Sequence, residues 1–308
     1  MDIVFMGTPE FAVPCLVRLI EDGHNIKGVF TQPDKPKGRG HKMQFPPVKE
    51  YALDADIPVY QPLKMRDGEA LAILEDLNPE LIIVVAYGKI LPAEILNFPR
   101  YGCINIHASV LPSYRGAAPI QWCVLNGESM SGVTAMQMDV GLDTGDMLLT
   151  KTVSIGENET AGELHDKLSV LGADVLSETI DLLLEGKLEP VKQNDELSNY
   201  APMLSKELCP IDWNEPADKV HNKVRGLSPW PVATTKWDEK NVKIHKTIVS
   251  DKYNGVPGEV LVSDNNLIVA CGDSTAIEIL TLQLEGKKAM SASDFLRGNP
   301  INNGTILK

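Results

Sequence analysis

Three polar residues have the types and spacing that chemistry on a carbonyl group requires. Asn105 and His107 alternate with apolar residues in the run CINIHAS, so in a strand their side chains would share one face. Asp143 stands in the glycine-flanked segment GLDTGD. An asparagine amide can donate to a developing oxyanion, a histidine can act as acid or base, and a carboxylate can orient the histidine ring. The three therefore suit nucleophilic addition to a carbonyl through a tetrahedral intermediate.

Structural roles for these residues stay open on the residues alone. An Asn-x-His pair on a strand is often structural, and an aspartate between glycines is a common turn residue. The G-x-S-x-G motif of acyl-enzyme hydrolases is absent from the sequence, and no metal-ligand spacing is present. These absences favour direct transfer of a group, with no bound metal.

The elements that would hold these residues alternate between strands and helices. Apolar runs predict strands over residues 2–7, 25–30, 81–88 and 103–109, with helical patterns between them. This order predicts a doubly wound, mainly parallel α/β sheet, in which the strand ends that carry chemistry meet at one edge. The turn after the first strand lacks G-x-G-x-x-G, so a dinucleotide site is not supported.

Capping residues predict two helix boundaries. Thr8, followed by Pro9, is the expected N-cap of the first helix. Thr160, Glu163 and Gly186 have the spacing of a capping box and a C-cap, which predicts one long helix between Thr160 and Gly186.

The chain has 308 residues, which is long enough for two domains. We predict a catalytic domain over residues 1–186, a polar linker over 187–205 and a second domain over 206–308. Short alternating runs in the second domain are typical of an OB-like β-barrel. No apolar run approaches the roughly 18–20 residues of a membrane span, and no targeting segment precedes the first strand, so we expect a cytoplasmic protein. The five scattered cysteines are expected to be reduced thiols in the core.

Charge is unevenly distributed along the chain. Residues 1–205 hold 16 Lys and Arg against 29 Asp and Glu, a net charge of −13, whereas residues 206–308 hold 13 of each. Within the acidic part, residues 31–49 form a long segment rich in proline and glycine, which predicts an irregular loop. It carries five basic residues against one aspartate and can contact phosphate groups on an otherwise acidic body. A solvated surface loop is the alternative.

The strand and loop around His107 resemble a known signature. NIHASVLPSYRGAAPIQW, with VTAMQMDVGLDTGD downstream, is similar to the motif of the formyltransferases that use 10-formyltetrahydrofolate. Their H-x-S-L-L-P pattern reads HASVLP here, with valine in place of the first leucine. Further segments, from VFMGTPEFAVPCL to LEGKKAMSASDFLRG, extend the resemblance over nearly the whole chain.

The resemblance implies roles for particular residues. Asn105, His107 and Asp143 match the catalytic residues of the family. The formyl donor, 10-formyltetrahydrofolate, is expected along three segments, mainly through backbone contacts and apolar walls. These segments contribute Ala86, Tyr87, Gly88 and Leu91, then Ser109, Val110, Leu111 and Pro112, and finally Met138, Asp139 and Gly141.

The resemblance also implies a macromolecular acceptor. It indicates a Rossmann-like catalytic domain without a dinucleotide, joined to an OB-like domain that helps hold tRNA, and a monomer with no DNA, membrane or metal partner. The expected acceptor is the α-amino group of methionine on initiator tRNA, used in translation initiation. Arg39 matches a functional arginine of the family, and Lys35, Lys37 and Lys42 lie in the same loop. A second group of basic residues could form a patch in the C-terminal domain: Lys219, Lys223, Arg225, Lys240, Lys243 and Lys246.

Three other functions share some of these features. A formyltransferase for a small acceptor, such as glycinamide ribonucleotide or an amino-sugar nucleotide, would use the same three polar residues. A hydrolase could release formate from the same donor, with water as acceptor. A tRNA-binding OB protein with a vestigial first domain would need no catalytic residues. The C-terminal domain and the basic loop favour a macromolecular acceptor over the first of these.

Overall fold

The chain folds into two compact units, which are described separately. The computed structural model describes residues 1–37, 42–250 and 254–308. Unit 1 comprises Met1–Gly116, Gly132–Val153 and His165–Tyr200, and unit 2 comprises Ala117–Ser131, Ser154–Leu164 and Ala201–Lys308. Each unit draws on several stretches of the chain, and the domain boundaries at residues 186 and 206 stay a prediction.

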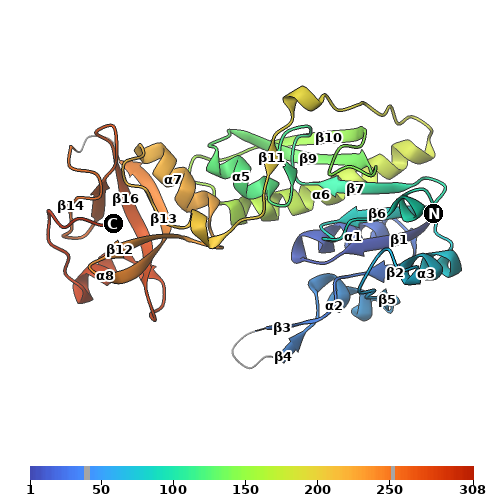
Figure 1. Cartoon of the computed structure of the whole chain (residues 1–308), viewed down its shortest axis with the longest axis horizontal. Coiled ribbons are helices and arrows are strands. Elements are labelled where there is room, and N and C mark those ends of the chain that lie inside the picture. The colour runs from blue at the N-terminus through green and yellow to red at the C-terminus, as the bar shows by residue number, and fades with distance from the viewer. Residues whose placement is uncertain (38–41, 251–253) are drawn as a thin grey trace. The chain divides into compact units, whose positions relative to one another are not determined.

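Unit 1 is built on a seven-stranded sheet with the order β10-β9-β7-β6-β1-β2-β5 (Figure 1). The strands from β5 to β7 pair in parallel, and β9 runs antiparallel to β7. The predicted α/β fold with a mainly parallel sheet is therefore confirmed. The strands are β1 (Asp2–Gly7), β2 (Asn25–Phe30), β5 (Val59–Tyr60), β6 (Leu81–Val85), β7 (Cys103–His107), β9 (Met130–Gln137) and β10 (Met147–Ser154).

The central strands of this sheet are buried on both faces. Val4 and Ile82 pack in one core cluster with Leu74 of the third helix, whereas their neighbours Ile3 and Ile83, which point the other way, are also fully buried. Burial on both faces explains why these strands read as continuous apolar runs. The helices with residues in unit 1 are α1 (Val13–Glu21), α2 (Pro47–Asp54), α3 (Glu69–Leu77), α4 (Ala93–Leu96) and α6 (Ala161–Leu184), the first turn of which belongs to unit 2.

The first helix begins later than the sequence predicts. A 3₁₀ turn over Glu10–Ala12 precedes α1, and Pro14 lies in the first turn of the helix. Thr8 is not its N-cap, so that prediction is wrong. The Thr8 hydroxyl donates to the carbonyl of Tyr87 at 3.1 Å and accepts the amide N–H of Gln32 at 3.2 Å. Thr8 thus joins the segments that follow β1, β2 and β6.

The basic segment is more regular than predicted. Its described part forms an antiparallel hairpin of β3 (Lys35–Lys37) and β4 (Lys42–Gln44). At the base of the hairpin, the Lys49 ammonium donates to both carboxylate oxygens of Asp34, at 2.8 and 2.7 Å. Lys49 is therefore committed to an ion pair that joins the two ends of the segment.

Unit 2 contains an antiparallel sheet with the order β12-β13-β16-β15-β14, and β17 pairs with β16. Its core includes Trp213, Ile244 and Phe295, all buried. An OB-like barrel stays a prediction. The strands are β12 (Ala233–Trp237), β13 (Lys240–Ser250), β14 (Val260–Val262), β15 (Leu267–Ala270), β16 (Ala276–Leu284) and β17 (Met290–Ser291), and the helices are α5 (Pro119–Leu125), α7 (Ala217–Gly226) and α8 (Ala292–Gly298).

Two further observations concern the predicted class of protein. Within the described ranges, no helix has both the length and the apolar character needed to cross a membrane. All five cysteines are buried thiols, and burial raises the pKa of Cys15 to about 12. The thiols are therefore poor nucleophiles near neutral pH.

Candidate active site

Strand β7 presents Asn105 and His107 on one face of the sheet in unit 1. Asn105 lies between Val84 of β6 and Met136 of β9, and His107, the last residue of the strand, lies beside Thr134 of β9. The two polar residues are two positions apart in a strand, so their side chains point to the same side. The carboxyl ends of β1, β6 and β7 meet at this edge, where open α/β sheets bind ligands.

The His107 ring is buried and is held through one of its two nitrogens. Its Nε2 lies 3.0 Å from the carbonyl oxygen of Tyr114, and only 7% of the side chain is exposed. Because a carbonyl only accepts hydrogen bonds, Nε2 carries a proton in this arrangement. Nδ1 lies 3.9 Å from Asp143 Oδ2, which is close enough for an ion pair when the ring is charged. The free ring position thus faces a carboxylate.

Asp143 reaches His107 because the β9–β10 loop folds back. The last residue of β9, Gln137, lies beside Ile104 near the start of β7, so the loop must return along β7. Asp143 adopts a φ of 54°, in the left-handed region that non-glycine residues rarely occupy. Its Oδ2 accepts the backbone N–H of Gly116 at 2.8 Å. The structure therefore brings Asp143 and His107 together although 36 residues separate them.

The side-chain amide of Asn105 is available for a ligand. The side chain is half-buried, and no residue in the described parts of the chain forms a hydrogen bond with it. An amide carries two N–H donors. Beside a charged histidine, this amide can stabilise negative charge that develops on a substrate oxygen.

The Ser109–Pro112 segment is fixed by a residue that the sequence did not single out. The hydroxyl of Thr134 donates to the Ser109 carbonyl at 2.8 Å and accepts the N–H of Leu111 at 3.2 Å. Ser109 Oγ donates to the Ser113 carbonyl at 2.7 Å, and the Leu111 side chain is buried. This segment therefore offers mainly backbone to a ligand.

The segment after β6 behaves in the same way. The side chains of Tyr87 and Leu91 are buried in a core cluster, and the Tyr87 hydroxyl donates to the sulfur of Met65 at 3.4 Å. Ala86 and Gly88 are exposed, with positive φ angles of 47° and 78°. Burial raises the pKa of the Tyr87 phenol, so it stays neutral. Because Ala86 and Gly88 have at most a methyl side chain, they expose mainly backbone at this edge of the sheet.

The third predicted donor segment lies in the β9–β10 loop. Met138 packs against the same core cluster as Tyr87. Asp139 is exposed, and its Oδ1 accepts the N–H of Gly141 at 3.0 Å and the hydroxyl of Thr144 at 2.7 Å. The Asp139 carboxylate therefore shapes the loop that carries Asp143.

The structure describes only part of the predicted tRNA contacts. Lys35 is exposed on the β3–β4 hairpin, which also carries Lys37 and Lys42. Arg39 lies outside the described residues. In unit 2, Arg225 does not belong to a surface patch, because it is 5% exposed and donates to Asn222 at 2.8 Å and to the Glu159 carbonyl at 3.1 Å.

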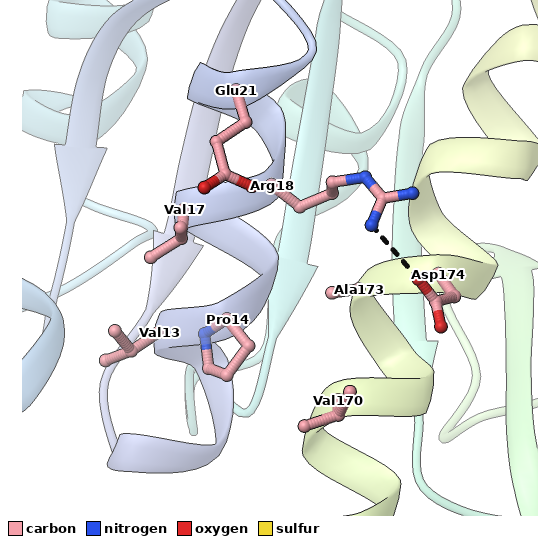
Figure 2. A pocket seen from close by; sticks show the side chains of 8 residues that line it. All are labelled: Val13, Pro14, Val17, Arg18, Glu21, Val170, Ala173 and Asp174. Carbon is pink, nitrogen blue, oxygen red and sulfur yellow. Dashed lines mark hydrogen bonds and ion pairs between the residues drawn. The ribbon is translucent and has the colours of Figure 1, made fainter.

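A groove of about 340 Å³ lies elsewhere in unit 1, between α1 and α6 (Figure 2). Pro14 from α1 faces Val170 from α6 across it, and Arg18 bridges one end through a 3.0 Å bond to Asp174. The three candidate catalytic residues do not line this groove. In the described ranges, no group of three or more His, Cys, Asp or Glu side chains is placed to hold a metal ion.

Comparison with known proteins identifies the family. A family model described as "Formyl transferase" matches residues 1–180, and one described as "Formyl transferase, C-terminal domain" matches residues 203–300. The chain belongs to the formyl transferase family.

Curated relatives of this formyl transferase share one name. A "Methionyl-tRNA formyltransferase" from Caldanaerobacter subterraneus subsp. tengcongensis is 54% identical over 310 residues, with 100% of both chains covered. Another, from Geobacter metallireducens, is 53% identical over 308 residues and covers 100% of this chain and 98% of the relative. Like them, this chain is an enzyme of the transferase class.

Solved structures with lower identity share the fold of this formyl transferase. The sugar 3N-formyl transferase WlaRD, solved in the presence of dTDP and 5-N-formyl-THF, has a TM-score of 0.71 at 22% identity and covers 94% of this chain and 99% of its own. HypX from Aquifex aeolicus, in complex with tetrahydrofolic acid, has a TM-score of 0.65 at 19% identity and covers 96% of this chain and 46% of its own.

Sequence reasoning missed several residues that hold the site of this formyl transferase. Thr134 lies directly across from His107 in the strand pair, and Gly116 donates to Asp143. Tyr114 supplies the carbonyl that fixes the His107 ring. Gly116 and Tyr114 stand in the SYRGAAP segment already singled out, whereas nothing in the sequence around Thr134 marks its hydroxyl as a partner of two backbone groups.

Proposed function

We propose that this formyl transferase moves the formyl group of 10-formyltetrahydrofolate to the α-amino group of methionine on initiator tRNA, for translation initiation. The observation that carries the proposal is the cluster of Asn105, His107 and Asp143, in which the Asn105 amide has no hydrogen-bond partner among the described residues. Relatives named methionyl-tRNA formyltransferase that match the full chain support the choice of acceptor.

The proposed reaction is a direct attack of the free amine on the formyl carbon. A carbon–nitrogen bond to methionine forms, the bond between the formyl carbon and the folate nitrogen breaks, and that nitrogen takes up a proton as tetrahydrofolate leaves. Asn105 and charged His107 donate to the oxygen that gains negative charge, each donor contributing about 3–4 kcal/mol to transition-state stabilisation. Because Nε2 is committed to the Tyr114 carbonyl, Nδ1–H is the His107 donor that remains for a substrate oxygen.

Asp143 has two proposed tasks in this reaction. It orients the His107 ring through the 3.9 Å approach to Nδ1, and it assists removal of the proton that the attacking amine must lose. Its low exposure, 13% of the side chain, strengthens its electrostatic effect on the ring.

The donor folate is proposed to bind along backbone that the site leaves open. Exposed Ala86 and Gly88 follow β6, which adjoins β1 at the point where the strand order reverses. Ligands of open α/β sheets bind at such switch points. The segments Ser109–Pro112 and Met138–Gly141 would complete the walls, so the chain would recognise folate mainly by shape and backbone hydrogen bonds.

Two regions are proposed to hold the acceptor tRNA. The β3–β4 hairpin carries Lys35, Lys37 and Lys42 and is expected to reach the acceptor end together with Arg39. The antiparallel sheet of unit 2 is expected to act as an OB-like module that contacts the tRNA backbone. We expect the enzyme to work as a monomer in the cytoplasm.

One experiment separates this function from its rivals. Purified protein with 10-formyltetrahydrofolate is offered charged initiator tRNA, an amino-sugar nucleotide, glycinamide ribonucleotide or water alone. We expect formyl transfer to the tRNA, with alanine at Asn105, His107 or Asp143 lowering kcat more than it changes KM. Transfer only to the small amines, or formate release alone, would overturn the proposal.

A further inference from the structure

The side chain of Gln193 is bonded to the turn that carries Asp143. Gln193 follows α6 in the stretch predicted to be a linker, yet its Nε2 donates to the carbonyl of Asp143 at 2.8 Å and to that of Gly145 at 2.7 Å. On the other side, its Oε1 accepts from Arg115 Nε at 3.0 Å and Nη2 at 2.9 Å. All of these residues belong to unit 1.

Only an amide can occupy this position without losing hydrogen bonds. Two carbonyl oxygens require donors, and a guanidinium requires an acceptor, so the two N–H groups and both lone pairs of the Gln193 amide are used. Glutamate has nearly the same shape but would set a carboxylate oxygen against the two carbonyls. The contact therefore requires the N–H donors of glutamine as well as its size.

These bonds close a ring around Asp143. Gly116, the residue after Arg115, donates its N–H to Asp143 Oδ2 at 2.8 Å. The carbonyl of Asp143 is thus held by Gln193, and its carboxylate is held by the neighbour of the arginine that binds Gln193. The left-handed backbone at Asp143, with a φ of 54°, persists only where surrounding contacts fix it.

The stretch that carries Gln193 is also hydrogen-bonded to the segment that carries Arg115. Asn199 accepts the N–H of Arg115 at its carbonyl, at 3.0 Å, and the N–H of Tyr114 at its side-chain oxygen. The second partner of Arg115, Asp195, is 81% exposed, and an ion pair with so exposed a carboxylate contributes little. The bonds to Gln193 and Asn199 are therefore the main interactions that hold Arg115 against this stretch.

We propose that Gln193 is a positioning residue, which sets the Asp143 carboxylate against His107 from outside the catalytic cluster. The proposal rests on the catalytic role proposed for Asp143. Gln193 touches no reacting atom and acts through the turn, so its loss should change turnover and leave substrate binding intact.

The kinetic test compares Q193A, Q193E and the control K192A, whose side chain is exposed and outside the ring. We expect both Gln193 variants to lower kcat by about 10- to 100-fold, the effect of a misplaced catalytic group, with unchanged KM for the donor. K192A should match the parent. In a D143A background, Q193A should cost nothing more, because the residue through which it acts is gone.

A second measurement does not depend on activity. Hydrogen exchange at the Gly116 amide reports its bond to Asp143, and we expect exchange about tenfold faster in Q193A and Q193E than in K192A. Parent-like kcat and parent-like Gly116 exchange in Q193E would overturn the proposal, as would a full additional loss in the D143A background. If the parent transfers no formyl group at all, the proposed function fails, and Gly116 exchange alone still decides the role of Gln193.

Discussion

The side-chain amide of Asn105 offers the most direct test of the proposed chemistry. It has no hydrogen-bond partner in the described parts of the chain, although it lies two residues from the firmly held His107 ring. A half-buried amide without a partner adds little to folding stability. Its value is expected in the transition state, where an oxyanion would satisfy it.

We therefore expect Asn105→Ala to lower kcat by about 100- to 1,000-fold, as for other oxyanion donors, with little change in KM or thermal stability. Steady-state kinetics with charged tRNA and thermal unfolding measure the two effects. Asn25→Ala is the matched control, because among the described residues that amide bonds only Asp2, at the exposed start of β2. A variant at Asn105 that unfolds more easily but turns over normally would remove it from the catalytic set.

Thr134 gives a second prediction, about binding of the donor. Its fully buried hydroxyl joins the Ser109 carbonyl to the Leu111 N–H, so Thr134→Val leaves both backbone groups without that partner. We expect a loss of about 1–3 kcal/mol in the free energy of unfolding and a higher KM for the donor. Urea unfolding and donor titration measure these changes.

Thr150→Val is the control for that variant, since Thr150 is an exposed residue whose hydroxyl, within the described parts of the chain, bonds that of Thr134 at 3.1 Å and no backbone group. It should change neither quantity by a comparable amount. An unchanged donor KM in Thr134→Val would show that the Ser109–Pro112 segment does not bind the donor.

At this scale the sequence predicted which polar side chains share a face of the sheet and missed the contacts that hold them. The alternation in CINIHAS placed Asn105 and His107 on one face, and the structure places them so. The contacts of Asp143 could not be predicted, because Gly116 donates a backbone N–H and Gln193 lies 50 residues away. Contacts made by backbone groups, or by residues far apart in the chain, produce no pattern in the sequence.

Among the helices and strands, α7 contacts β13 in unit 2 through a buried histidine as well as through apolar side chains. His221 Nδ1 lies 2.9 Å from the Thr247 hydroxyl, and Nε2 lies 3.0 Å from the Glu157 carbonyl. Because the carbonyl can only accept, Nε2 donates to it, and in a neutral ring this leaves Nδ1 to accept from the hydroxyl. Burial lowers the pKa of His221 below its ordinary value of 6.5.

This lowered pKa predicts a loss of stability in mild acid. The unfolded chain binds a proton at His221 more readily than the folded chain does, so the stabilisation is complete above pH 6.5 and is lost as the pH falls towards the folded pKa. Urea unfolding at pH 7.5 and 5.5 should show a lower midpoint at pH 5.5. That difference should shrink in His221→Gln and persist in the control His245→Gln, whose ring bonds Gln283 at 3.1 Å. If the midpoint differed between the two pH values by the same amount in both variants, the role of His221 would be contradicted.

The elements with local signals were predicted best. The capping box of α6 forms as predicted, with the Thr160 N–H bonded to Glu163 at 2.8 Å and the Glu163 N–H bonded to Thr160 at 3.2 Å. The start of α1 was predicted wrongly, because Thr8 is used between strand ends, a contact that only the folded sheet creates. The β3–β4 hairpin was missed for a similar reason, since a pair of three-residue strands leaves no clear alternation.

For the whole molecule, the distribution of charge bears on the acceptor. Strand β13 buries Val242 and Ile244, which leaves Lys243 exposed on the outer face of the unit 2 sheet, and Lys236 and Lys246 are exposed as well. In the described ranges none of these lysines forms an ion pair with a carboxylate. A sequence with equal numbers of both charges in residues 206–308 can thus still present unpaired cations to a polyanion.

These lysines lead to a prediction about salt. If the outer face of β13 contacts tRNA phosphates, each contact releases counterions, and the affinity falls as salt rises. Lys243→Gln should weaken tRNA binding and reduce the slope of log affinity against log salt by about one. Lys27→Gln, at a lysine 3.9 Å from Asp2 in unit 1, should leave that slope unchanged. Fluorescence titration of tRNA at several salt concentrations measures both, and an unaltered slope in Lys243→Gln would place the tRNA on another face.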